Sequence, residues 1–256
     1  MLRLALCMLL MLPGLSMIAY GQQGMPVDTV DNLIIYSNEK SGLLIAHSSG
    51  IGLGYRTGVN KSIMNTRSWA FEFVTMQSPK QVKTINPYYT NSRRYVYGKL
   101  NDVFIVRAGI SEKRLLNRKP YWGGVELRWL WETGASLGIE KPYYLFVVRL
   151  VPGPGGNLSY TIDTERFDSD VSWDDIYGKA PFTRGLNEIK LRPGAYGKLG
   201  FNFEFGNVRT STRSVEVGVV TDVHPFGLSI MDSNTNQRLF LNFYLSYAMG
   251  KRFNKY

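Results

Sequence analysis

A histidine and a serine two positions apart interrupt an otherwise apolar alternation near the start of the chain. Side chains of a strand alternate between its two faces, so residues at every second position point the same way. If residues 42–56 form one strand, His47 and Ser49 therefore point in the same direction as the apolar Ile45 and Ile51. Polar side chains on an outward apolar face are costly and demand a reason, so this pair is a candidate for catalysis. The alternative is a polar pair that a neighbouring element covers, or a bulge that turns the pair inward.

A second candidate set consists of charged residues at alternating positions of strand-like stretches. By parity they fall on the inner face of a closed sheet: Arg56, Glu72, Arg107, Glu126, Arg128, Lys198, Glu204, Glu216 and Asp222. Because an eight-stranded barrel is just wide enough for side chains to fill, and isolated buried charges are costly, these charges should pair. We interpret them as a structural network of salt bridges. The alternative is a polar path for a small solute or a proton.

A third candidate is an acidic run, formed by Asp163, Glu165, Asp168, Asp170, Asp174 and Asp175. Asp168, Asp170 and Asp174 could supply oxygen ligands to a calcium ion. The run lacks the twelve-residue spacing and the glycine of the helix-loop-helix calcium motif, which favours a solvated loop face. Ser172 could instead cap a short helix running to Tyr177.

Strands must position these residues, because the apolar pattern has a period of two. The clearest stretch is residues 239–253, where Leu239, Leu241, Phe243, Leu245, Tyr247 and Met249 form one face. In a membrane barrel this face points to lipid, whereas in a soluble sandwich it would point to a protein core. Eight strands are expected, at residues 42–56, 67–76, 95–111, 122–138, 143–150, 195–205, 213–222 and 237–250.

The predicted fold class is all-β: an antiparallel transmembrane up-and-down β-barrel of eight strands. Counting back from the last strand places residues 151–194 outside the cell as a long loop, together with residues 224–236. Residues 206–212 become a short inner turn. Residues 77–94 fall on the periplasmic side although they are long, and this misfit leaves ten strands as the alternative.

The two ends of the chain point to export. Arg3, an apolar run and small residues before Gln22 predict a signal peptide over residues 1–21. We expect residues 22–40 to be a periplasmic lead-in and residues 41–256 to be the barrel. Cys7 is the only cysteine, so the mature chain would have neither a disulfide nor a cysteine metal site, and no cofactor is expected.

The aromatic last strand, followed by Lys251-Arg252-Phe253, resembles that of Gram-negative outer-membrane β-barrel proteins, whose assembly machinery reads such a strand. Asp28-Thr29-Val30 also resembles the O-glycosylation pattern of Bacteroidota exports, although chance readily produces three such residues. The resemblance implies a small Bacteroidota-type barrel in the bacterial outer membrane. The net charge of +10 then favours outer-membrane lipid and lipopolysaccharide as partners, with other envelope proteins possible and no nucleic acid.

The order His-x-Ser-Gly over residues 47–50 resembles the motif of outer-membrane lipid A deacylases. That resemblance implies Ser49 as nucleophile and His47 as its base. The sequence departs from the family where Gly50 replaces the expected asparagine, and no acidic partner can be named.

The function favoured by the sequence is a structural or interaction barrel that binds a partner or ligand through its outer loops. Such a barrel could also accompany a secretion or transport assembly. A lipid A deacylase that uses His47 and Ser49 is one alternative, and a narrow pore or transporter is the other. An enzyme is the less favoured of these classes, since no complete catalytic constellation is visible.

Overall fold

The computed structural model describes residues 36–118, 124–152, 157–168, 171–205, 210–233 and 236–254. The predicted signal peptide, residues 1–21, lies outside this part of the chain, as does the lead-in up to residue 35. Across the described ranges, no helix is long and apolar enough to cross a membrane.

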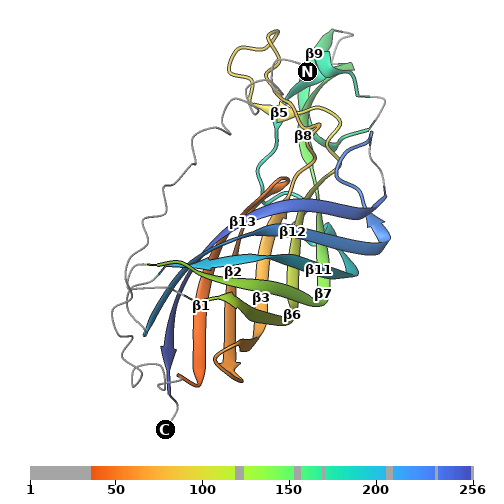
Figure 1. The fold of residues 1–256 in the computed structure, drawn as a ribbon. Coiled ribbons are helices and arrows are strands. Elements are labelled where there is room, and N and C mark those ends of the chain that lie inside the picture. Colours follow the sequence, from red (N-terminus) through yellow and green to blue (C-terminus); the bar gives the residue numbers. More distant parts are fainter. Residues whose placement is uncertain are drawn as a thin grey trace, which may run out of the picture. The chain divides into compact units, whose positions relative to one another are not determined.

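Eight strands close into one antiparallel barrel, which confirms the predicted fold class (Figure 1). Each strand pairs with its neighbour around the ring, and the last strand pairs with the first. The strands are β1 (Asn38–His47), β2 (Gly50–Asn60), β3 (Asn65–Met76), β6 (Asn101–Asn117), β7 (Glu126–Pro142), β11 (Lys190–Glu204), β12 (Ser211–Leu228) and β13 (Gln237–Phe253). The barrel thus starts at Asn38, inside the expected lead-in of residues 22–40.

The prediction of one strand over residues 42–56 is wrong. A tight turn at Ser48 and Ser49 divides this stretch into β1 and β2, which pair with each other. The turn also reverses which parity faces inward: Leu43 and Ile45 are buried in the lumen, whereas Ile51 and Leu53 are exposed. An apolar alternation that continues across a two-residue turn reads as one long strand in the sequence.

The stretch at residues 143–150 is a strand but not part of the barrel. β8 (Tyr144–Pro152) pairs with β9 (Leu158–Arg166) and β10 (Ile176–Lys179) in a separate three-stranded sheet, here called the outer sheet. Residues 151–194, expected to be a loop, therefore contain β9, β10, the 3-10 turns Trp173–Asp175 and Leu186–Glu188, and the start of β11. The predicted count of eight is still correct, because two errors cancel. The sequence prediction counted β1 and β2 as one strand, and it counted β8 as a barrel strand.

The corrected strands explain the long connection at residues 77–94. Asn38, Phe253 and the short connection 61–64 lie at one end of the barrel, here called the terminal end. The connections 77–100, 143–189 and 229–236 all lie at the opposite end, here called the loop end, and the first of them carries the small hairpin β4 (Lys83–Thr84) and β5 (Tyr95–Val96). The two longest connections, 77–100 and 143–189, therefore share one end, as in barrels with long extracellular loops.

The barrel is apolar outside and polar inside. Outward-facing side chains include Leu53, Trp69, Phe71, Phe201, Leu241 and Phe243, and Phe243 is 70% exposed. Inward-facing glycines make room for large lumen residues: a Cβ on Gly109 or Gly200 would collide with the hydroxyl of Tyr196 or Tyr244, respectively. Small residues on one strand thus allow bulky residues from another to fill the lumen.

Candidate functional site

The centre of the lumen is a network of paired charges. Arg56, on β2, lies 2.5 Å from Glu216 Oε1 and 3.0 Å from Glu132 Oε2. Its side chain is 2% exposed, and Glu132 and Glu216 are buried as well. Asn202 and Ser246 donate further hydrogen bonds to the Glu216 carboxylate, so that this acid is held by three neighbouring groups.

A second arginine holds the loop-end half of the same network. Arg107, on β6, makes two parallel hydrogen bonds to Asp222, from Nε at 2.9 Å and from Nη2 at 2.7 Å. Its Nη1 donates to Glu72 at 3.1 Å, and Lys198 donates to the other oxygen of Glu72 at 2.6 Å. Two-point contacts of this kind fix the orientation of the guanidinium as well as its charge.

Cations and acids balance in this central cluster. Its cations are Arg56, Arg107, Lys113 and Lys198, and its acids are Glu72, Glu132, Glu216 and Asp222. Lys113 lies 3.7 Å from Glu216. Burial of charges is tolerable only when partners and hydrogen bonds replace water, and a balanced cluster meets that condition.

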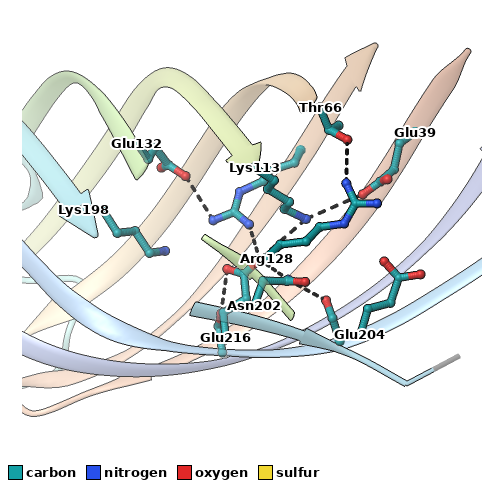
Figure 2. Close-up of polar contacts among 12 residues, drawn as sticks. Glu39, Thr66, Lys113, Arg128, Glu132, Lys198, Asn202, Glu204 and Glu216 are labelled. Atoms are coloured by element: carbon teal, nitrogen blue, oxygen red, sulfur yellow. Dashed lines mark hydrogen bonds and ion pairs between the residues drawn. The ribbon is translucent and has the colours of Figure 1, made fainter. Parts of the chain in front are cut away.

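The network continues to the terminal end of the barrel (Figure 2). Arg128 donates to Thr66 at 3.2 Å and pairs with Glu126 at 2.5 Å. Glu204 accepts two hydrogen bonds from Arg252, whose Nε also donates to Glu39. Ion pairs therefore reach from the middle of the lumen to the terminal end of the barrel.

All nine charges assigned inward by parity take part in this network. Sequence reasoning missed Glu39, Lys113, Glu132 and Arg252, which belong to it as well. Glu132 has the same parity as Glu126 and Arg128 on one strand, so that the pattern already contained the information needed to find it. The other three lie just beyond the strand ends that the sequence predicted.

An apolar layer closes the lumen toward the loop end. It is built by Val74, Met76, Val103, Ile105, Leu228, Ile230, Met231 and Phe240, all buried. Below it, Arg107 and Lys198 are each 1% exposed. The central charges are therefore shielded from bulk solvent, and side chains fill the lumen between them and the loop end.

His47 and Ser49 do not form a catalytic pair in this arrangement. His47 faces the lumen and is 9% exposed, contrary to the expected outward direction, because the turn at Ser48 and Ser49 reverses the parity of β1. The His47 ring accepts a hydrogen bond at Nδ1 from the Ser49 backbone N–H at 3.3 Å. The Ser49 hydroxyl donates instead to Asn242 at 2.5 Å. The two serines and Asn242 thus tie the β1–β2 turn to β13.

The acidic run does not gather into a metal site in the part of the chain that the structure describes, where no group of three potential ligands occurs. Asp170 lies outside those residues. Glu165 pairs with Arg149 at 2.7 Å, and this hydrogen bond lowers the pKa of the Glu165 carboxyl. The predicted helix from Ser172 to Tyr177 is a single 3-10 turn, Trp173–Asp175, without a side-chain cap from Ser172.

The outer sheet has a hydrophobic core of its own. This core consists of Tyr95, Tyr143, Leu145, Val147, Phe167, Val171 and Ile176. Asn86, itself buried, donates hydrogen bonds to the carbonyls of Trp173, Asp174 and Ile176 and fastens the 77–100 connection to the sheet. Burial raises the pKa of Tyr143 to about 12. The outer sheet is therefore a packed unit and not a loose loop.

One face of the outer sheet is apolar and uncovered. Leu150 on β8 lies opposite Tyr160 on β9, and Ile162 lies two residues along from Tyr160. Tyr160 is 74% exposed, and Leu150, Leu158 and Ile162 are each more than half exposed. β9 is also an edge strand, since its only neighbour in the described sheet is β8. An exposed apolar face beside a free strand edge is a typical interaction surface.

Comparisons with known proteins extend this picture only slightly. The sequence matches no protein-family model and no curated protein. Among solved structures it is similar to Neisserial surface protein A, with a TM-score of 0.39 and 9% identity over 84% of this chain and 96% of that chain. It is also similar to Ail, the attachment invasion locus protein of Yersinia pestis, with a TM-score of 0.34 and 8% identity over 85% of this chain and 97% of that one. The strand pairing itself establishes the barrel.

Proposed function

We propose that this chain is an integral β-barrel protein of the bacterial outer membrane that binds a protein partner through its outer sheet. The observation that carries the binding role is the uncovered apolar face formed by Leu150, Leu158, Tyr160 and Ile162. The membrane location has separate support in the polarity of the barrel wall.

The barrel wall fits a lipid environment. Outward apolar residues on β13 run from Leu239 to Met249, which matches the roughly 9–11 residues that a membrane-crossing strand needs. The paired charges lie inside, so that the polarity of the barrel is the inverse of a soluble protein's. A closed barrel also leaves no unpaired strand edge in the hydrocarbon.

The filled lumen supports a binding role over transport. Arg56, Arg107 and Lys198 block the centre with ion pairs, and an apolar layer covers them. The outer sheet, in contrast, has its own core and keeps its apolar face free. Binding surfaces carried on a rigid scaffold are the common arrangement in such proteins.

Contact with lipopolysaccharide is a second role that the loop end supports. The 77–100 connection exposes four cations, Lys80, Lys83, Arg93 and Arg94. Exposed cations at the level of a phosphate-rich leaflet attract it electrostatically. This contact would complement the apolar surface and does not compete with it.

Cysteine labelling tests the membrane topology. We expect Tyr160→Cys to react with a membrane-impermeant maleimide on intact cells, because β9 lies at the loop end. Lys61→Cys, in the short connection at the terminal end, should react only after the outer membrane is permeabilised. The parent chain is the control for background labelling. Its only cysteine, Cys7, lies in the predicted signal peptide, so the mature parent should not react. The reverse labelling pattern would show that the loop end faces the periplasm and that the proposed topology is wrong.

Site-specific photo-crosslinking tests the binding surface. Tyr160 and Thr161 are neighbours on β9 that face opposite sides of the outer sheet, and both are exposed. A photoreactive residue at position 160 should give one discrete adduct on cells, whereas position 161 should give none. Equal adducts at both positions, or none at either, would contradict a specific apolar interface.

A further inference from the structure

A pocket lined by cations opens on the outer wall of the barrel at the terminal end. Its volume is about 510 Å³, and Lys40, Arg213 and Lys251 contribute to its lining. These residues come from three adjacent strands, β1, β12 and β13. All three side chains are exposed and face away from the lumen network.

The arrangement of these cations is unfavourable by itself. Lys40 lies directly opposite Lys251 on the neighbouring strand, and like charges in that position repel each other. None of the three has an ion-pair partner in the described ranges, whereas Arg252, next in the chain, is paired with Glu39 and Glu204. Three unpaired cations around one pocket point to an anionic ligand.

The floor of the pocket leaves space for a bulky group. Gly42 faces outward between the cations, and a Cβ placed there would meet no atom within 4 Å. Tyr55 and Phe253 flank the opening, and Lys40 Nζ lies 5.2 Å from the centroid of the Phe253 ring. Aromatic and cationic side chains together are typical of the membrane–water interface.

The pocket continues into an apolar groove on β1, β12 and β13 that extends onto β2 and β3. Leu44, Tyr247 and Val215 lie two residues beyond Gly42, Met249 and Arg213, which is about 7 Å along each strand. They begin a groove of about 630 Å³ that Ile51, Leu53 and Leu245 also line. A charged opening is thus followed directly by a long apolar path toward the middle of the wall.

We infer that this composite site binds a glycerophospholipid of the inner leaflet of the outer membrane. Its phosphate would contact Lys40, Arg213 and Lys251, and an acyl chain would lie in the groove. The inference rests on the proposed membrane location, which places the terminal end at the periplasmic face. Phospholipids with a net negative headgroup suit the site best, because three cations exceed the charge of one phosphate. Both halves of the ligand therefore meet a matching surface.

Native mass spectrometry of the detergent-folded, heat-modifiable protein tests the site with dioleoyl-phosphatidylglycerol as the probe. Changing Lys40, Arg213 and Lys251 together to Gln should weaken binding about a hundredfold, at roughly fivefold for each cation near a lipid surface. The matched control changes Lys61, Arg67 and Arg114 to Gln, which removes the same charge from exposed positions at the same end. The control should bind like the parent, and an equal loss in both variants would overturn the inference.

A second variant separates a shaped site from simple charge attraction. Gly42→Phe keeps all three cations and fills the pocket, and the open space above Gly42 lets the barrel fold. We expect it to bind at least tenfold more weakly than the parent, and glycerol 3-phosphate, which lacks acyl chains, not to bind detectably. Unchanged binding by Gly42→Phe would refute the site. If the parent is heat-modifiable but does not bind the probe, the lipid site fails alone, whereas a parent that is not heat-modifiable contradicts the proposed function itself.

Discussion

Replacing Arg107 by methionine should lower the free energy of unfolding of the barrel by about 3–5 kcal/mol, the usual cost of breaking a buried ion pair from one side. Methionine fills much of the same space but leaves Asp222 without its two-point partner and removes one of the donors to Glu72. Urea unfolding in phospholipid vesicles, followed by tryptophan fluorescence, measures the loss.

Two further variants identify the source of the effect. Arg107→Met combined with Asp222→Asn removes both charges and should recover most of the lost stability, since no uncompensated charge then remains. Arg67→Met, on the exposed face, should change stability by no more than about 0.5 kcal/mol. If the double variant were as unstable as the single one, packing rather than pairing would hold Arg107 in place.

The fold class could be predicted because parity is a local property. On β3, β11, β12 and β13 the alternation of large apolar and small or charged residues gave the correct inward and outward faces residue by residue. Trp69, Phe201, Val217 and Phe243 face out, and Glu72, Lys198 and Glu216 face in. Such a pattern needs no knowledge of which strands are neighbours.

Strand boundaries could not be predicted, because they depend on partners far along the chain. The β1–β2 turn is fixed by hydrogen bonds from Ser48 and Ser49 to Asn242, nearly two hundred positions away. β8 has the same alternating pattern as a barrel strand. Its Leu145 and Val147 nevertheless belong to the core of the outer sheet, together with Ile176 and Phe167. No local signal distinguishes these pairings.

The same limit applies to the candidate sites. The inward charges followed from parity, but their pairing did not: Arg56 meets Glu216 only because β2 and β12, which are not neighbours in the ring, both turn these side chains into the lumen. The cationic pocket needs the register that sets Lys40 opposite Lys251, and two lysines more than two hundred positions apart show no relation in the sequence. His47 was misplaced because one turn reversed its strand's parity.

Changing Phe243 to arginine should cost about 2–4 kcal/mol and impair assembly of the barrel, as arginine does at the middle of a lipid-facing wall. Phe243 lies near the centre of the outward apolar run of β13 and is 70% exposed, so that no protein neighbour would shield or pair with the new charge. The measurements are heat-modifiable migration and the fraction of protein recovered in the outer membrane.

The matched control is Tyr160→Arg on the outer sheet. Tyr160 is an aromatic residue with nearly the same exposure, 74%, on a strand that belongs to the outer sheet and not to the barrel. In water the new arginine is solvated, so the variant should assemble like the parent. The pair of variants therefore compares one substitution in two environments. If both assembled normally, the outer wall of the barrel would not face lipid, and a soluble barrel would be the better description.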